Sequence, residues 1–584
     1  MPTWRDLFST TERRFFPEVV VPLARDPNSV TLESNANANA NADAEKKDTP
    51  SDHPPDYRSD SSPDRSSLQE KGVAAVPANP SGELTLESLR AEVEAGVVVS
   101  GHDSIYDRKA KIINRAIQDI GMGRYQWGLF VLCGFGWVAD NLWLQGVALT
   151  LTPLANEFGI SGNDSRFATC ALFVGLIVGA SFWGIASDIV GRRPAFNCTL
   201  LICGAFGLAA GGGPNWVGTC ALYACIGLGV GGNLPVDAAV FCECLPPDSG
   251  NILSGLATWW SVGTLISSML AWAFIPNFSC DDSAPVCLKA DNWGWRYLVL
   301  TLGAITFCMF LCRFLLFTFY ESPKFLVSRG RQDEAVAAVQ GIARKNKTTT
   351  WLTTDLLNEL GGIAEQREAE KLPVGEIIKR SLSRFSVQQI APLFATKRLG
   401  LSTVLLWFCW TCIGMGYTLF NAFLPQYLGQ NSTVYETYRN YAITAVCGIP
   451  GPLLAWGMVD LPYIGRKGTM AFSTVVTGVL LFCFTATKDP NIQLVCSALE
   501  SFFQMMMYGV LYAYTPEVFP APNRGTATGI ASCLNRIAGL MAPIIGIYAS
   551  TDPLAPIYAS GALILASFIA MIFLPFETRG KQIV

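Results

Sequence analysis

The stretch GIASDIVGRR, residues 184–193, closes one long apolar segment, and GRKG, residues 465–468, stands at the same place after another. Their glycines, Gly191 and Gly465, lie 274 positions apart (465 − 191). The same offset relates three further pairs: Glu243 and Glu517, Pro246 and Pro520, and Gly255 and Gly529. A shared offset predicts two halves of one topology, which is how many transporters are built around a central cavity.

The composition around these motifs is that of a protein that crosses a membrane many times. Half of the 584 residues are hydrophobic, 15% are charged, and the mean hydropathy is positive. A helix needs about 20 apolar residues to cross the hydrocarbon core, and twelve such stretches occur. We therefore predict an all-α membrane protein with twelve transmembrane helices in two pseudo-symmetric six-helix bundles. The spans are expected to begin near Tyr125, Phe167, Ala195, Val217, Ile252, Tyr297, Leu399, Tyr441, Met470, Ile492, Thr526 and Leu554.

The rest of the chain divides by composition. An N-terminal region rich in Asn, Ser, Asp and Pro is typical of a disordered tail, and Ile112, Ile113, Ala116 and Ile120 give the next segment one apolar face. That helix is expected to lie on the membrane surface, with an ordinary solvated helix as the alternative. The predicted divisions are a cytosolic tail 1–104, an amphipathic helix 105–124, a bundle 125–320, a cytosolic linker with short helices 321–398, a bundle 399–576 and a cytosolic C-terminus 577–584.

Charge predicts the orientation. The linker 321–398 is rich in Lys and Arg, which favours the cytoplasmic side, and an even number of spans then places both termini there. The plasma membrane is the expected location. Sequons at Asn163, Asn277 and Asn431 fall on the outer side, although Asn197 and Asn346 are sequons on the inner side. Cys280 and Cys287 share an outer loop, where a disulfide and two free thiols remain alternatives.

The motif at 184–193 resembles the loop signature of the major facilitator superfamily. The matching residues are Gly184, Asp188, Gly191, Arg192 and Arg193. The second copy keeps Gly465, Arg466 and Lys467, whereas its acid, Asp460, is displaced by two positions. The resemblance implies alternating access between two bundles.

The arginines of this signature need carboxylates as partners. Glu243 and Glu517, at the inner ends of the fourth and tenth spans, are the natural candidates for Arg192 and Arg466. Bridges that form only when the cavity is closed to the cytoplasm would bias a two-state equilibrium. The alternative is static anchoring by positive charge. The predicted inner gate comprises Gly184, Asp188, Gly191, Arg192, Arg193, Glu243, Arg466, Lys467, Glu517 and Arg524.

Three more stretches look like signatures of the sugar-porter group: YESPKFLVSRGR at 320–331, PEVFPAPNRGTATG at 516–529 and PFETRGK at 575–581. The motifs GMGRYQW, GFGWVADN and GLGVGGNLPVD are more similar to the synaptic-vesicle-protein-like branch, which includes carriers of organic acids and vitamins. The chain departs from hexose porters at Tyr223, where those have Arg, and at Gly250 and Asn251, where those have Arg-Gly.

Asp140 is an acid in the middle of the first span. A charge there costs about 2.5 to 3.5 kcal/mol on insertion scales, so it should face a wet cavity and serve a function. We interpret Asp140, with Asn141 beside it, as a proton-coupling site, because a carboxylate in a low dielectric can bind and release a proton. Asn535 and Arg536 in the eleventh span could neutralise Asp140 or bind an anionic solute.

Three other charges lie in predicted spans. Glu500 is either a second proton site or a hydrated group near the outer end. Arg313, about two turns from the inner end of the sixth span, is expected to snorkel to the interface and to be structural. Asp237 is expected near the inner gate with Glu243.

The leading functional hypothesis is secondary active transport of a small polar organic solute, such as a sugar or an organic acid, with protons as the coupled ion. A proton-driven exporter and a non-transporting nutrient sensor on the same fold are the alternatives. An enzyme is not expected, because both histidines, His53 and His102, lie in the tail and no phosphate-binding loop is present. We expect a monomer in the lipid bilayer, with no cofactor, metal or nucleic-acid partner.

Overall fold

The computed structural model describes residues 15–23, 85–100, 105–249, 252–280, 287–362, 390–429, 432–459, 464–519, 521–548 and 554–578. Predictions about Asp460, Asn431, Gly250 and Asn251 therefore fall outside the described residues. The same holds for the side chains of Asp188 and Arg524, whose backbones lie in helices.

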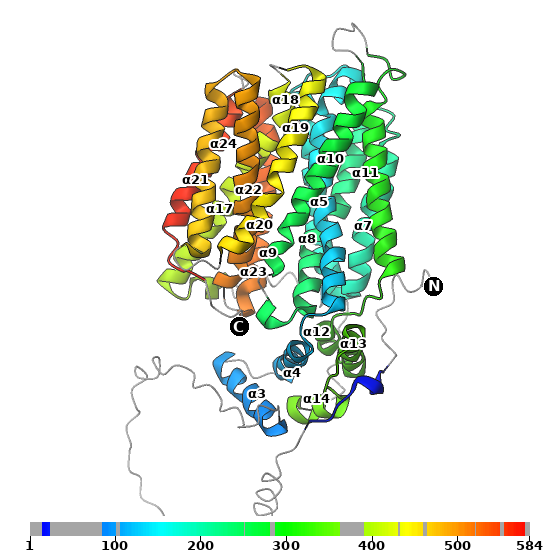
Figure 1. Cartoon of the computed structure of the whole chain (residues 1–584), viewed down its shortest axis with the longest axis vertical. Coiled ribbons are helices and arrows are strands. Elements are labelled where there is room, and N and C mark those ends of the chain that lie inside the picture. The colour runs from blue at the N-terminus through cyan, green and yellow to red at the C-terminus, as the bar shows by residue number, and fades with distance from the viewer. Residues whose placement is uncertain are drawn as a thin grey trace, which may run out of the picture.

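Within this described part, twelve helical stretches are long and apolar enough to cross a membrane, which confirms the predicted fold class. Figure 1 shows them as two groups that stand side by side, one from each half of the sequence. The first six are α5 (Arg124–Phe158), α6 (Phe167–Val190), α7 (Arg192–Ala210), α8 (Trp216–Cys244), α10 (Ala257–Phe278) and α11 (Gly294–Leu311) with the π-helix η4 (Cys312–Leu316). The second six are α17 (Lys397–Asn421), α19 (Val434–Gly448) with α20 (Pro450–Met458), α21 (Gly465–Ala486), α22 (Pro490–Val518), α23 (Ala521–Tyr548) and α24 (Ala555–Ile572).

Most predicted starts lie within a few residues of the observed ones, and the largest difference has a local cause. The span expected near Tyr441 begins at Val434, because Thr433 and Glu436 form a capping box that starts the helix in a polar stretch. Hydropathy does not register such a stretch. The fifth span begins at Ala257 instead of Ile252, after the short helix α9 (Ile252–Gly255).

Small residues allow the helices of the first half to pack closely. A Cβ atom on Gly175 of α6 would lie 2.9 Å from the Cα atom of Gly227 on α8, closer than real Cβ contacts. Backbones that touch in this way are typical of membrane helices, where packing rather than hydrophobicity drives association. The closeness of α6 and α8 fixes the position of the Gly-rich part of α8.

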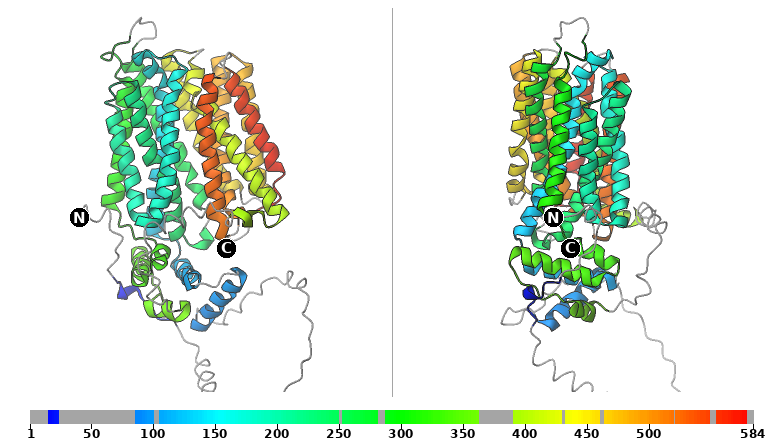
Figure 2. Two further views of the ribbon diagram at one scale, coloured as in Figure 1. Left: turned by 180° about the vertical axis from the view of Figure 1, so that it is seen from behind. Right: turned by 90° about the vertical axis from the view of Figure 1, so that its right-hand side faces the viewer.

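A layer of short helices covers one end of the bundle. It contains α3 (Leu86–Ser100), α4 (Ile105–Ile120), α12 (Pro323–Ser328), α13 (Gln332–Asn346) and α14 (Thr354–Gly361). Figures 1 and 2 show this layer below the two bundles. We call this the linker end. The opposite end, where Cys280 and Cys287 form a disulfide, is the disulfide end.

The helix predicted to lie on the membrane surface packs inside this layer instead. Ile112 and Ile113 of α4 are fully buried, and α4 contacts α14, α12 and α3. Its apolar face is therefore covered by protein, which corrects the surface prediction. Asn346, at the end of α13, accepts from the backbone N–H of Tyr125 at 2.8 Å and donates to Gln126 at 2.8 Å, so the layer is bound to the start of α5.

Candidate functional site: a central cavity between two closed ends

A cavity of about 70 Å³ lies midway along the bundle, between the two halves. Its lining residues come from both: Asp140, Asn141, Leu144, Phe173, Leu176, Leu234 and Trp260 from the first half, and Gly414, Tyr417, Thr418, Met505, Tyr508, Tyr512, Ser532, Asn535 and Arg536 from the second. Four of the five residues predicted for coupling and solute binding therefore meet in one cavity. The fifth, Glu500, is not among them.

Asp140 and Asn141 form the polar side of the cavity in the first half. Asp140 is only 4% exposed. The side-chain nitrogen of Asn141 donates to the carbonyl of Trp260 at 3.3 Å, and the Tyr417 hydroxyl donates to the Asn141 oxygen at 3.4 Å. Asn141 thus joins α5 to α10 in its own half and to α17 in the other half, which fixes the position of the neighbouring carboxylate.

Arg536 enters the cavity from the second half and is anchored on the first. Its Nη1 atom donates to the carbonyl of Gly231 at 3.2 Å and reaches that of Leu176 at 3.5 Å. The Gly231 carbonyl can accept because Pro235, four residues later in α8, has no N–H to bond it. A helix-breaking residue of one half therefore provides an acceptor for the arginine of the other half.

Arg536 was expected either to neutralise Asp140 or to bind an anionic solute, and in this conformation the two described side chains do not form a direct ion pair. The charges lie in the same cavity and within electrostatic range, but no ion pair joins these two described side chains within 4.0 Å. Nη2 of Arg536 is buried and, among the described atoms, has no hydrogen-bond partner. The guanidinium therefore keeps a donor that a solute could use.

The two remaining predicted groups differ in position. Asn535 lines the cavity and donates to the carbonyl of Trp410 at 3.1 Å, which ties α23 to α17. Glu500 is 1% exposed, lies beside Asn421 and is not part of the cavity lining. The alternative of a hydrated Glu500 near the outer end is therefore wrong.

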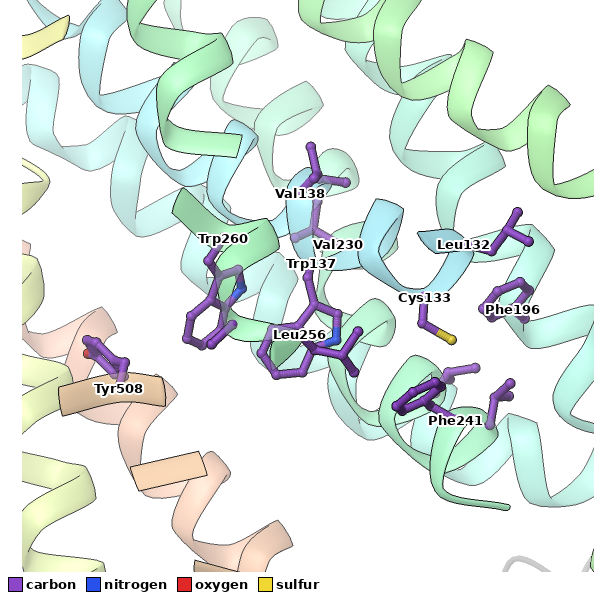
Figure 3. Packing of buried hydrophobic residues seen from close by; sticks show 14 of the residues in the cluster. Leu132, Cys133, Trp137, Val138, Phe196, Val230, Phe241, Leu256, Trp260 and Tyr508 are labelled. Carbon is purple, nitrogen blue, oxygen red and sulfur yellow. The ribbon is translucent and has the colours of Figure 1, made fainter. Parts of the chain in front are cut away.

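Aromatic rings form the wall of the cavity toward the linker end. The ring centroid of Trp260 lies 5.0 Å from that of Trp137, 4.8 Å from that of Tyr512 and 5.7 Å from that of Tyr508. Trp410 adds a contact to Tyr512 at 4.7 Å. Figure 3 shows Trp260 between Trp137 and Tyr508. Edge-to-face clusters of this kind offer flat, apolar surfaces against which a ring can pack.

Hydrogen bonds between the halves close the cavity toward the disulfide end. Gln145 of α5 donates to the Tyr417 hydroxyl at 2.8 Å and accepts from the Tyr441 hydroxyl. The Tyr438 hydroxyl donates to the carbonyl of Leu149 at 3.0 Å. Beyond this layer lies a second, larger cavity of about 540 Å³ that is lined by neutral residues of both halves, including Asn156 and Gln426.

Arg166 reinforces this closure, and the sequence analysis did not identify it. Its Nη1 atom donates to the carbonyl of Gly546 at 2.7 Å, and its Nε atom donates to Gln426 at 3.1 Å. The guanidinium also lies over the ring of Phe423, 4.6 Å from the centroid. Arg166 is 6% exposed, and all three of these contacts are in the opposite half.

Three bonds between the halves end on backbone carbonyls that lie four residues before a proline. A proline at position i cannot bond the carbonyl of residue i − 4, so that carbonyl is free to accept a side chain. The pairs are Tyr438 with Leu149 before Pro153, Arg536 with Gly231 before Pro235, and Ser261 with Gly448 before Pro452, the last at 3.2 Å. The prolines mark these acceptor carbonyls in the sequence, but they do not identify the side chains that donate to them.

The linker end contains both predicted gate pairs, each within one half. Arg192 contacts Glu243 at 3.4 Å and donates to the Ser187 hydroxyl at 2.8 Å. In the second half Arg466 pairs with Glu517. These pairs join helices of the same bundle, so at the linker end they hold α7 to α8 and α21 to α22.

One further glutamate completes each gate motif. The carboxylate of Glu321 accepts from the backbone N–H groups of Arg192 and Arg193 at 2.9 and 3.1 Å, and Glu577 accepts from those of Arg466 and Lys467 at 3.1 and 3.2 Å. Each carboxylate satisfies free donors at a helix N-terminus, where the helix dipole favours negative charge. Burial raises the pKa of Glu321 above its ordinary value, and these backbone donors oppose that rise.

The remaining gate residues have distinct roles. Gly191 and Gly465 have φ angles of 113° and 61°, which explains the glycine at both turns. Lys467 donates to the carbonyl of Leu574 at 2.7 Å. A Cβ atom on Gly184 would meet nothing within 4 Å, so packing in this conformation does not require that glycine.

Arg313 and Asp237 are placed differently from the prediction. Arg313 does not snorkel: its side chain is fully buried, and Nη2 contacts the Asp237 carboxylate at 2.7 Å. Asp237 is therefore partnered by Arg313 in the core of the first half and not by the gate around Glu243. The pairing depends on the relative rotation of α8 and η4, which hydropathy does not predict.

Two pseudo-symmetric bundles, a charged cavity at their midpoint and separate closures at each end define a secondary transporter that works by alternating access. Comparisons with known proteins agree. The family model for the Major Facilitator Superfamily matches residues 128–460 and 406–583. The chain belongs to the major facilitator superfamily.

Relatives in fungi cover most of the chain. MFS siderochrome iron transporter 1 of Ceriporiopsis subvermispora is 46% identical over 82% of this chain and 92% of its own length, and the transporter hxnZ of Emericella nidulans is 40% identical over 81% and 88%. More distant is the synaptic vesicle 2-related protein of Xenopus laevis, at 25% over 86% and 87%. The fold is similar to the partially occluded, inward-open xylose transporter XylE from E. coli, with a TM-score of 0.60 and 18% identity over 78% of this chain and 99% of XylE.

Proposed function

We propose that this secondary transporter moves a small organic acid that carries a ring, together with a proton. Asp140 binds the proton, Arg536 binds the carboxylate, and the aromatic wall packs against the ring. The observation that carries the proposal is that an acid of one half and an arginine of the other line a single cavity without forming an ion pair. Each charge is thus available to a separate ligand.

Three features support an anionic ring compound over a neutral sugar. The spare donor of Arg536 suits a carboxylate, which guanidinium groups bind in planar geometry. Trp260, Tyr508 and Tyr512 supply ring faces and edges. Tyr223, which stands where hexose porters have Arg, donates to or accepts from Thr150 at 3.1 Å inside the first half, and it does not line the cavity.

The size of the cavity favours a small solute. Sites for drug-sized ligands have volumes of about 300 to 1,000 Å³, whereas this cavity is about 70 Å³ in the closed conformation. We therefore place the substrate among monocarboxylates with a single ring.

The proposal also includes an orientation in the membrane, a location, an oligomeric state and a direction of transport. We place the linker end in the cytoplasm, because the linker is basic. The protein is proposed to work as a monomer in the plasma membrane, with both termini cytoplasmic, no nucleic-acid partner and no enzymatic step. Import driven by an inward proton gradient is the leading direction.

The test is uptake into reconstituted vesicles from a panel of ring monocarboxylates, hexoses and amines, with and without an inward acid gradient. Gradient-stimulated uptake of a ring monocarboxylate is the expected result. Asp140→Asn is expected to abolish accumulation against a gradient while exchange at equal pH partly remains. Unchanged accumulation in this variant would exclude Asp140 as the coupling site.

The proposed role of Arg536 is tested by measuring how strongly variants bind the solute. Arg536→Gln removes a charge-assisted contact worth roughly 1.5 to 3 kcal/mol, so the solute concentration for half-maximal uptake should rise roughly 10- to 100-fold. Arg536→Lys keeps the charge but lacks the planar donors. Its solute concentration for half-maximal uptake should therefore lie between those of the wild type and Arg536→Gln. Selective uptake of a hexose that is insensitive to Arg536→Gln would support the sugar alternative, and uptake of no compound would favour a sensor or an exporter.

A further inference from the structure

The seam between α5 and α8 contains buried polar groups that the cavity site does not use. Asn233 is fully buried, and among the described atoms neither its oxygen nor its nitrogen has a hydrogen-bond partner. The same is true of Oδ1 of Asp237. Buried polar atoms are normally satisfied by protein or by internal water. This seam is therefore a candidate site for water and for protons.

The seam starts at the central cavity. Leu234 lines the cavity, and Arg536 contacts the Gly231 carbonyl, so the part of α8 that includes Asn233 adjoins it. Gly136 on α5 lies against Asp237, since a Cβ atom there would lie 2.9 Å from the side-chain carbon of Asp237. Glycine is needed at this position to admit the ion pair.

Helix geometry then gives the positions of Asp140 and Asp237 along the length of the bundle. The two helices run in opposite directions: α5 begins at the linker end and α8 finishes there. Asp140 is one turn beyond Gly136, and Asn233 is one turn before Asp237, both toward the disulfide end. Asp140 and Asn233 therefore share one level, and Asp237 lies one turn, about 5.4 Å, closer to the linker end.

Arg313 is held in a way that lets its partner become neutral. Besides Asp237, it donates to the carbonyls of Leu132 at 2.9 Å and Phe196 at 2.7 Å, and it lies 3.8 Å from the centroid of the Phe196 ring. Figure 3 shows Leu132, Cys133 and Phe196 grouped on the far side of Trp137 from the cavity aromatic Trp260. If Asp237 takes up a proton, these contacts still hold the guanidinium. The π-helix that carries Arg313 is a feature often found at functional sites.

We propose that Asp237 is a second proton-binding site, which receives the coupled proton from Asp140 through water held at Asn233. The Asp140 carboxyl gives its proton to this water, the water gives a proton to the Asp237 carboxylate, and Asp140 is left ionised. The proton then moves toward the linker end inside the first half, whereas the solute moves between the halves. The titratable or charged groups that face Asp237 are Arg313 from η4, the Cys133 thiol from α5 and, one turn away, Asp140. This inference rests on the proposed coupling role of Asp140.

The next acid along the route is Glu243, six residues beyond Asp237 on α8. It is partly exposed at the linker end, where it pairs with Arg192. Its Oε2 atom is buried and has no hydrogen-bond partner among the described atoms. Release of the proton at this end would take place beside the Arg192–Glu243 pair.

The experiment uses the full-length protein in vesicles and two kinds of variant. Asp237→Asn combined with Arg313→Gln removes both charges, so no unpaired charge remains in the core. Asn233→Leu removes the water-binding amide at similar volume. Thr219→Val, which changes another buried polar side chain of α8 near the disulfide end, is the matched control. Each variant is assayed for gradient-driven accumulation, for exchange at equal pH, and for proton entry with a trapped pH dye.

Both test variants should keep exchange near the wild-type rate and lose roughly tenfold or more of accumulation and of solute-dependent proton entry, as expected when one step of a coupled cycle is removed. Thr219→Val should retain accumulation, exchange and solute-dependent proton entry. Full accumulation in the test variants, or loss of exchange in a folded Asn233→Leu protein, would overturn the second proton site. Failure of the wild-type protein to respond to a pH gradient would instead overturn the proposed proton coupling itself.

Discussion

At the disulfide end Arg166 reaches across the molecule to the backbone of Gly546, whereas at the linker end Arg192 and Arg466 each pair with a glutamate of their own half. The first contact must break when the halves separate on that side. The other two can persist through a rocking motion of rigid bundles. The arginines at the two ends therefore have different roles: Arg166 joins the two halves, whereas Arg192 and Arg466 join helices within one half.

The difference bears on the inner-gate hypothesis. Bridges that form only in one conformation would have to join the halves, and in this structure the two gate pairs do not. They hold the ends of helices within each bundle, together with Glu321 and Glu577. We therefore expect the linker-end pairs to act mainly on stability and the disulfide-end contacts to act mainly on the conformational equilibrium.

The largest effect is expected from breaking the Arg466–Glu517 pair. Both side chains are 7% exposed, and removal of one partner of a buried pair costs about 3 to 5 kcal/mol because a charge is left without compensation. Arg466→Ala should therefore lower the yield of folded protein and its thermal midpoint in detergent. Arg466→Leu combined with Glu517→Leu should be closer to wild type. Arg192→Ala should cost less, because that pair is 15% and 20% exposed.

This prediction is checked by melting curves of the purified variants and by transport assays of the folded fraction. If the folded fraction of the double variant transports at a normal rate, the pair serves stability. A double variant that is stable but locked in one conformation would show that the pair gates transport after all.

The next effect concerns the equilibrium between conformations. Arg166→Gln removes charge-assisted bonds worth roughly 1.5 to 3 kcal/mol each, and a loss of about 2 kcal/mol changes an equilibrium roughly 30-fold. The variant should open more often at the disulfide end. An impermeant thiol reagent added on that side should react faster with a cysteine placed at the cavity residue Leu144. Lys488→Gln, which changes an exposed cation at the same end, is the control.

The linker-end contacts were predictable from the sequence and the disulfide-end contacts were not. Arg192 and Glu243 follow motifs that recur at one offset, so their pairing can be inferred from the repeat. Arg166 binds a backbone carbonyl, and every residue has one, so no partner residue identifies it. The twelve spans were predictable because each needs only length and apolar composition.

The central site was partly predictable for the same reasons. Asp140 and Arg536 are conspicuous because charge is costly inside a membrane. Their lack of a direct ion pair was not predictable, since it depends on the carbonyl that Pro235 frees in α8. Asp237 and Arg313 were each visible as charges, but their contact requires the rotation of two helices about their axes.

The smallest effect tests the proline-freed carbonyls. Tyr438→Phe removes one neutral hydrogen bond, worth about 1 kcal/mol, so labelling of the cavity cysteine from the disulfide end should rise roughly fivefold. Pro153→Ala supplies an N–H that competes for the Leu149 carbonyl and should act in the same direction.

Because both changes remove the same bond, the double variant should shift labelling no further than Tyr438→Phe alone. Pro276→Ala is the matched control: it changes a proline within α10, and no side chain in the described part of the chain donates to the Trp272 carbonyl that this proline frees. Additive effects of Tyr438→Phe and Pro153→Ala would mean that Pro153 acts through the bend of α5 instead. If Pro276→Ala had an effect as large as that of Pro153→Ala, helix prolines in general would act through the bend of their helix. Arg166 alone would then support the conclusion that contacts at the disulfide end, unlike those at the linker end, control the conformational equilibrium.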